Sequence, residues 1–136
     1  FNKIYKNWDR KQYQEYLKKF RLPEKKEIKT FSKGMQVKLS LAVALSHHAK
    51  LLILDEATSG LDPVMRDEIL DIFLDFVQDE EHSILVSSHI TSDLEKIADY
   101  ITFIDNGRVL MSKPKDELIY EYGIARCKES QFLQMD

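Results

Sequence analysis

The spacing of apolar residues predicts two helices in the first third of the chain. Aromatic and aliphatic residues three and four positions apart predict an amphipathic helix over 9–20, with Asp9 as its cap. Ser32 is a good cap for a second helix, which we expect to be buried because it is apolar around most of its circumference. A polar, lysine-rich connector over 23–30 joins the two helices.

The pattern then changes to short continuous apolar runs, over 51–54 and 83–87, which are typical of strands buried on both faces. Between them, Asp62 followed by proline predicts the start of a helix that continues to about residue 78. Because strands and helices alternate, we expect an α/β fold with a parallel sheet.

The remaining residues predict smaller elements. Residues 92–95 form a capping box that opens a short helix to Ala98. Strands over 100–104 and 108–111 flank Asp105-Asn106-Gly107, a strong hairpin signal, and would bring a thin sheet to four strands. A helix is expected over 115–122, and the tail from 124 is too weakly patterned to assign.

Composition is compatible with a packed core, since 43% of the 136 residues are hydrophobic and 32% are charged. The single cysteine, Cys127, excludes an intramolecular disulfide, and no apolar run approaches the ~20 residues of a membrane-spanning helix. Residues 1–50 hold 13 basic and four acidic side chains, whereas residues 51–136 hold seven and 19. The basic half is compatible with nucleic acid, an acidic partner, or the solvated surface of lysine-rich helices.

Glycine positions exclude two nucleotide-binding motifs. None of the four glycines is followed by lysine, so these residues contain no G-x-x-x-x-G-K-[ST] phosphate loop, and they contain no G-x-G-x-x-G either. Any nucleotide chemistry must therefore rest on other parts of a nucleotide site.

Polar residues follow both predicted parallel strands. Asp55 and Glu56 end the first, and His89 comes just after the second, so all three should meet at the carboxyl edge of the sheet, where α/β ligands bind. An aspartate there can hold Mg²⁺, a glutamate can orient or deprotonate water, and an imidazole can hydrogen-bond a phosphate oxygen. Solvated loop carboxylates and an ordinary loop histidine are the alternative interpretation.

Two further segments have weaker signals. The helix start at Ser32, Lys33 and Gly34 offers backbone N–H groups and a cation to a phosphate, although every capped helix shares some of this. The loop over 59–62 could present Asp62 to a partner, and a simple helix cap explains that residue equally well.

In this order, the segments resemble the carboxyl-terminal part of an ATP-binding-cassette (ABC) ATPase domain from residue 31 onward. The run Leu-Leu-Ile-Leu-Asp-Glu-Ala-Thr-Ser-Gly-Leu-Asp-Pro is highly specific to that family. The resemblance implies a partial P-loop NTPase core, RecA-like and ABC-type, with a mostly parallel sheet, a carboxyl-terminal hairpin and a remnant of the helical subdomain. The implied parts are the end of that subdomain with a connector (1–30), the signature helix (31–48), the catalytic core (49–123) and a tail (124–136).

The resemblance also implies a role for each matched residue. The matches are the general base Glu56, the switch histidine His89, the Walker-B Asp55 for Mg²⁺ bound through water, the signature residues Ser32, Lys33, Gly34 and Gln36, and the D-loop residues Ser59, Gly60, Leu61 and Asp62. The signature residues would contact the nucleotide of the opposite subunit. Two motifs depart from the family pattern: the usual Leu-Ser-Gly-Gly-Gln is Phe-Ser-Lys-Gly-Met here, with Gln36 following, and the usual Glu-Pro-Thr is Glu-Ala-Thr. Lys33 thus stands where the family has its first signature glycine.

What the resemblance implies for function is the ATP-hydrolysing subunit of an ABC transporter, with ATP and Mg²⁺ as cofactors. Its partners would be a second such subunit in a head-to-tail dimer and a transmembrane permease, with no nucleic acid, at the cytoplasmic face of the membrane. Because no phosphate loop is present, we expect these 136 residues alone to be inactive, as a fragment would be. The alternatives are a soluble ABC-type ATPase acting in translation or on chromosomes, and a non-enzymatic interaction domain.

Overall fold

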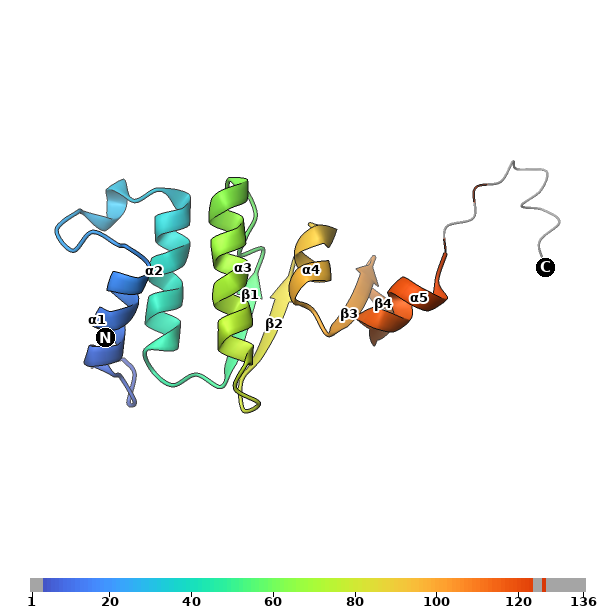
Figure 1. The fold of residues 1–136 in the computed structure, drawn as a ribbon, viewed down its shortest axis with the longest axis horizontal. Helices are drawn as coiled ribbons and strands as arrows, with labels where there is room; N and C mark the ends of the chain where they lie inside the picture. The colour runs from blue at the N-terminus through green and yellow to red at the C-terminus, as the bar shows by residue number, and fades with distance from the viewer. Residues whose placement is uncertain (1–3, 124–125, 127–136) are drawn as a thin grey trace. The chain divides into compact units, whose positions relative to one another are not determined.

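The computed structural model describes residues 4–123 and 126, and the described part of the chain divides into two units, with the boundary between Ile97 and Ala98. Each unit is considered by itself. The first contains α1 (Arg10–Lys19), the 3₁₀ helix η1 (Ile28–Thr30), α2 (Lys33–Leu45), β1 (Leu51–Asp55), α3 (Pro63–Val77), β2 (Ser83–Ser87) and α4 (Thr91–Ile97), and the second contains β3 (Tyr100–Asp105), β4 (Arg108–Pro114) and α5 (Lys115–Glu121) (Figure 1).

The long helices begin where the sequence predicts. The Asp9 carboxylate accepts a hydrogen bond from the Gln12 amide, and the Ser32 hydroxyl accepts one from the Met35 amide. Asp62 does the same at α3, whose first residue is proline. Each cap satisfies an amide that the helix itself leaves without an acceptor. The connector after α1 contains the short helix η1, which was not predicted.

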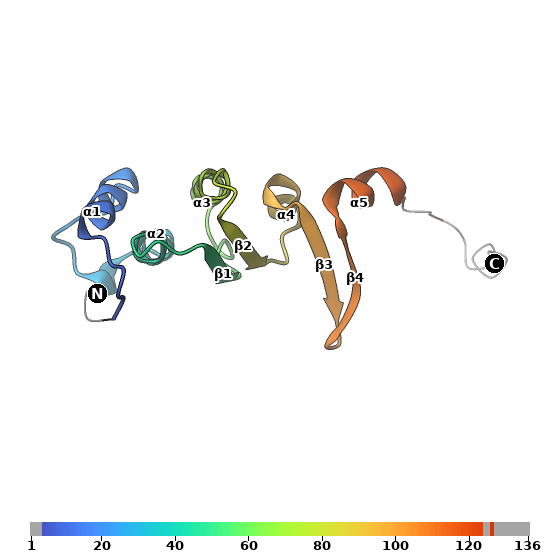
Figure 2. The same cartoon turned by 90° about the horizontal axis from the view of Figure 1, so that it is seen from below.

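The strands β1 and β2 pair in parallel, with Leu51 opposite Ser83 and Asp55 opposite Ser87. Figure 2 shows α3 and α4 on the same side of this pair. The core lies between the helices and this face of the strands, and its most buried apolar side chains are Phe20, Leu41, Ala42, Leu52, Ile69, Leu70 and Phe73. Burial of this apolar surface stabilises the unit and fixes how the strand ends are presented.

The opposite face of β1 and β2 is bare, so the predicted burial on both faces is wrong for this chain. Leu51, Ile53 and Leu85 point to this face and are 52, 72 and 63% exposed. The apolar pattern shows what a strand can bury, but within the described residues of the first unit, 4–97, α3 and α4 both cover the same side of the pair. The helix α2 is likewise less enclosed than predicted, because Gln36 and Ser40 remain exposed.

The predicted hairpin is confirmed in the second unit. Asn106 and Gly107 take φ angles of +46° and +74°, and the turn joins antiparallel β3 and β4. These strands pair with each other and not with β1 or β2, so the expected four-stranded sheet is wrong. The helix α5 matches its prediction, whereas the unassigned tail over 124–136 lies outside the described residues apart from 126.

The capping box predicted over 92–95 is also wrong. The helix α4 already begins at Thr91, which places Ser92 inside it. The Asp93 amide donates to the Ile90 carbonyl, and the Asp93 side chain is buried. A tertiary contact of Asp93, described below, therefore overrides the local motif. Across the described part of the chain, no helix is long and apolar enough to cross a membrane.

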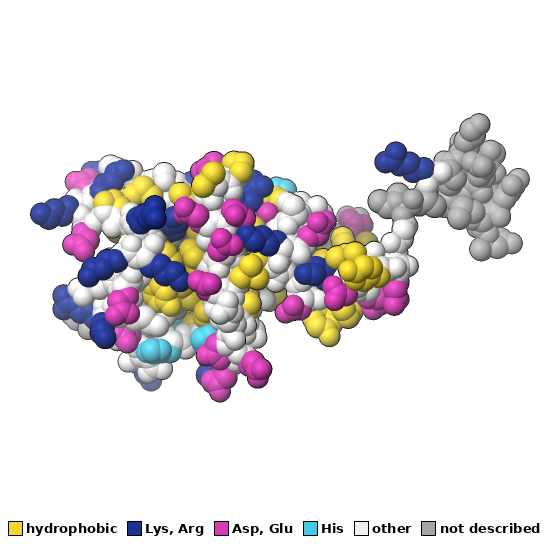
Figure 3. Space-filling model, viewed as in Figure 1, with side chains coloured by type: hydrophobic (Ala, Val, Ile, Leu, Met, Phe, Trp, Pro, Cys, Tyr) yellow, Lys and Arg dark blue, Asp and Glu magenta, His cyan; other side chains and the backbone are white. Residues whose placement is uncertain are grey.

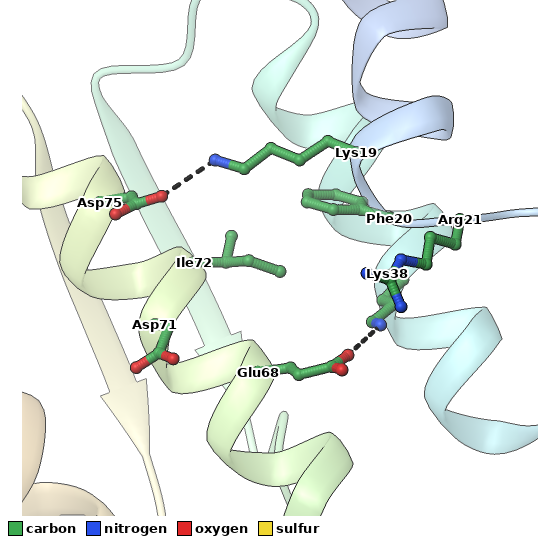
Figure 4. A pocket seen from close by; sticks show the side chains of 8 residues that line it. All are labelled: Lys19, Phe20, Arg21, Lys38, Glu68, Asp71, Ile72 and Asp75. Atoms are coloured by element: carbon green, nitrogen blue, oxygen red, sulfur yellow. Dashed lines mark hydrogen bonds and ion pairs between the residues drawn. The ribbon is translucent and has the colours of Figure 1, made fainter.

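The two signs of charge meet within the first unit. Lysine and arginine side chains gather over α1 and the connector, and carboxylates gather over α3 (Figure 3). In the groove between α1, α2 and α3, Lys19 pairs with Asp75 at 2.9 Å, and the buried Lys38 pairs with Glu68 (Figure 4). These pairs link α1 and α2 to α3.

Candidate functional site

The carboxyl ends of β1 and β2 form one edge at which several polar side chains meet. Asp55 is the last residue of β1 and lies in register with Ser87, the last residue of β2. The Ser87 hydroxyl donates a hydrogen bond to Oδ1 of the Asp55 carboxylate. Asp55 is exposed, so its charge is available at the rim of the sheet.

Glu56 turns the chain sharply away from β1. Its φ of +49° is in the left-handed region, which is strained for a residue with a side chain. The Glu56 amide donates to both the carbonyl and the hydroxyl oxygen of Ser87, each at 3.1 Å, and its carbonyl accepts from the Ser59 amide at 3.0 Å. These bonds hold the strained backbone in place.

The turn brings the Glu56 side chain against His89, which lies two residues beyond the end of β2. The distance between Glu56 Oε2 and His89 Nδ1 is 2.7 Å. Oε2 is shielded from solvent and has no aligned hydrogen bond within the described residues, so the approach of His89 is a close polar contact. Asp55, Glu56 and His89 thus lie together at one edge of the sheet.

The loop between β1 and α3 is anchored at two points. Thr58 donates a hydrogen bond of 2.7 Å to Asp93 on α4, and both side chains are only 3% exposed. The buried Leu61 holds the far end of the loop against the core. Sequence reasoning did not identify Asp93 as part of this region, because its one local signal was the capping motif.

The predicted residues at the start of α2 lie beside this loop. Ser32 and Lys33 are exposed, whereas Gly34 is buried so closely against Met65 that an added Cβ would lie 2.6 Å from the Met65 Cγ. The Lys33 ammonium lies over Gly60, where an added Cβ would be only 2.8 Å from it. The Gln36 amide nitrogen donates to the Phe31 carbonyl at 3.1 Å. The contacts of Lys33 and Gly34 are thus to the loop and α3 rather than to Glu56 or His89.

Residues 4–123 contain no group of three or more histidine, cysteine or carboxylate side chains close enough to hold a metal ion. The exposed Asp55 carboxylate, with the Ser87 hydroxyl beside it, is nevertheless an oxygen site of the kind that Mg²⁺ uses. Mg²⁺ commonly takes one or two carboxylates and completes its shell with water and phosphate oxygens. The residues at this edge therefore fit a magnesium ion that is bound together with a phosphate ligand.

Comparisons with known proteins agree with one another. The family model described as ABC transporter matches residues 1–59. The lantibiotic transport ATP-binding protein SrtF of Streptococcus pyogenes is 43% identical over 93 residues, covering 68% of this chain and 40% of SrtF. The ABC transporter ATP-binding protein YtrB of Bacillus subtilis is 32% identical over 120 residues, covering 88% of this chain and 41% of YtrB.

Two other matches extend this result. The bacitracin transport ATP-binding protein BcrA of Bacillus licheniformis is 39% identical over 94 residues, which is 69% of this chain and 31% of BcrA. A solved inward-facing ABC transporter structure matches the fold with a TM-score of 0.71 at 22% identity, covering 80% of this chain and 44% of that one. The chain thus spans about 40% of the length of SrtF and of YtrB.

Proposed function

Because this chain belongs to the ABC transporter family of ATP-binding proteins, we propose that it forms the carboxyl-terminal part of a subunit that hydrolyses ATP to power transport through a separate permease. The observation that carries the proposal is the 2.7 Å contact between Glu56 and His89 beside Asp55. A general base, a phosphate-binding imidazole and a magnesium carboxylate would thereby stand at one edge of the sheet.

In this proposal, Glu56 orients the attacking water and accepts its proton as the water oxygen bonds to the γ-phosphorus. The bond from that phosphorus to the oxygen that bridges it to the β-phosphate breaks, and ADP leaves with the electron pair. The His89 imidazole donates a hydrogen bond to the transferring phosphoryl group and keeps the Glu56 carboxylate turned toward the site. Asp55 holds Mg²⁺ through water, and the bound ion supplies positive charge that offsets the charge of the phosphates. Phosphoryl transfer depends mostly on such positioning and electrostatic stabilisation.

The exposed side chains of Ser32, Lys33 and Gln36 at the start of α2 support a second part of the proposal. Ser32, Lys33, Gly34 and Gln36 would contact the ATP held by an opposing subunit, and the loop over 59–62 would cross the interface between the two. Residues 31–48 then act as the signature helix and residues 49–123 as the catalytic core. The dimer would work at the cytoplasmic face of a membrane, where it engages the permease.

The experiment that tests this proposal is Glu56→Gln in a complete ATP-binding subunit that contains this segment. The amide keeps the size of the side chain but cannot accept the proton, so we expect turnover to fall by roughly a hundredfold or more. ATP binding, measured with a fluorescent analogue, and ATP-dependent dimer formation should persist.

Glu80→Gln is the matched control, because it makes the same change at an exposed glutamate after α3. It should hydrolyse ATP at the rate of the unmodified protein. Undiminished turnover in Glu56→Gln would remove Glu56 from the assigned role. Failure of the unmodified subunit to bind Mg-ATP would favour a non-enzymatic interaction domain instead.

A further inference from the structure

A buried hydrogen bond joins the same two segments of the chain as the Glu56–His89 contact. Thr58 Oγ1 donates to Asp93 Oδ2 at 2.7 Å, and both residues are 3% exposed. Carboxylates are rarely buried to this degree without a partner, because removing the charge from water is costly. The buried Asp93 carboxylate therefore needs the Thr58 hydroxyl as a partner, and we expect the hydrogen bond to persist in the folded protein.

The positions of the two partners connect this bond to the candidate site. Thr58 is two residues beyond Glu56, and Asp93 is four residues beyond His89. The segment 56–58 and the segment 89–93 are consequently joined twice, once at the exposed edge by Glu56 and His89 and once in the interior by Thr58 and Asp93. Two contacts between the same pair of segments restrict both their separation and their relative rotation.

The backbone at Glu56 makes this second contact consequential. Its left-handed conformation persists only where the surrounding structure holds it. The Ser87 bonds fix the amide of Glu56, while the loop that follows is held by Thr58 and by the Ser59 amide, which donates to the Glu56 carbonyl. Loss of the interior bond would release the carbonyl side of the turn and let the Glu56 side chain move relative to His89.

We propose that the Thr58–Asp93 hydrogen bond positions the Glu56 carboxylate against His89 and thereby sets the rate of the chemical step. Thr58 and Asp93 are positioning residues in this inference, which rests on the proposed ATP hydrolysis. Both side chains are buried, so we assign them no direct contact with the nucleotide. They act by restricting the geometry of the base, for which a displacement of about 1 Å can cost roughly a hundredfold in rate.

The test uses Thr58→Val in a complete ATP-binding subunit that contains this segment. Valine keeps the branched shape of threonine but removes the donor hydroxyl. We expect kcat to fall roughly tenfold to a hundredfold, with the KM for Mg-ATP changed by no more than about twofold, because ground-state binding is not involved. Thr58→Ser restores the hydroxyl and should recover most of the lost kcat.

Two additional variants separate positioning from a purely structural role. Thr102→Val is the matched control. Thr102 is an exposed strand residue of the second unit, where its hydroxyl bonds to that of Ser112, so the kcat of this variant should be unchanged. In the Glu56→Gln background, Thr58→Val should cause little further loss in single-turnover rate, because both changes act through the same carboxylate. A purely structural role would lower the melting temperature without this non-additivity.

The double variant Thr58→Val with Asp93→Leu keeps the test decisive if the single variant does not fold. It replaces both partners with apolar groups, so no unpaired buried group remains. It should show the same fall in kcat.

The outcomes distinguish this inference from the proposed function. If Glu56→Gln stops hydrolysis while the Thr58 variants turn over at the full rate, the positioning inference is overturned and the ATPase assignment stands. If the unmodified subunit does not hydrolyse ATP, or if Glu56→Gln remains active, the proposed function fails and this inference fails with it.

Discussion

The close approach of Gly34 to Met65 predicts how Gly34→Ala changes the free energy of unfolding. The direction of that change should depend on the residue at position 65. Gly34 lies in the first turn of α2, and a Cβ added there would lie 2.6 Å from Met65 Cγ and 3.0 Å from its sulfur. Both distances are shorter than an ordinary van der Waals contact. Gly34→Ala must therefore displace the Met65 side chain or separate α2 from α3.

The magnitude follows from two opposing terms. Overpacking of a fitted contact costs about 1–3 kcal/mol, whereas alanine is favoured over glycine in a helix by up to about 1 kcal/mol. We expect Gly34→Ala to lower the free energy of unfolding by about 1–2 kcal/mol. In a Met65→Ala background the clashing atoms are gone, so the same substitution should be neutral or stabilising by up to about 1 kcal/mol.

Urea unfolding of the 136-residue chain measures both effects. The single tryptophan, Trp8, reports on the region because its ring lies 5.0 Å from that of Tyr13 on α1. Unchanged m-values would show that the midpoints reflect stability alone. The reasoning would be refuted if Gly34→Ala had the same effect with methionine and with alanine at position 65, because the penalty would then not come from this contact.

Three further predictions follow. Asp62→Ala should cost about 0.5–2 kcal/mol in urea unfolding, because α3 loses the acceptor for its Met65 amide, and Asp62→Asn should retain most of that stability. Burial raises the pKa of the Tyr13 phenol above its ordinary value of 10.0, so the unfolded chain loses this proton at a lower pH than the folded protein does. The free energy of unfolding should therefore fall as pH rises beyond 10.0. Tyr13→Phe should lessen this fall, measured by comparing unfolding curves at about pH 8 and about pH 11. The 136-residue chain, which lacks the phosphate loop, should release no phosphate from ATP above background; measurable turnover would contradict the inactivity expected of it.

The elements with local causes could be predicted from the sequence. Asp9, Ser32 and Asp62 cap helices because the side chain and the amide that it accepts from are three residues apart. The turn at Asn106 and Gly107 needs left-handed backbone, which these residue types tolerate. The parallel order of the strands likewise placed Asp55, Glu56 and His89 at one edge.

What depends on tertiary context could not be predicted. Nothing local indicates that Glu56 takes a left-handed conformation, since glutamate does not favour it, yet this turn sets the contact with His89. The pattern at 92–95 favoured a capping box, but Asp93 is drawn into the interior by Thr58, a residue 35 positions away. The contact of Lys33 with Gly60 is equally non-local.

At position 56, the stability of the fold and the proposed catalytic role favour different residues, because the backbone there is left-handed. Glycine there would relieve backbone strain on the order of 1 kcal/mol while deleting the proposed base. Directed evolution for heat tolerance alone would therefore tend to discard the carboxylate. Only a screen that also demands turnover would retain it.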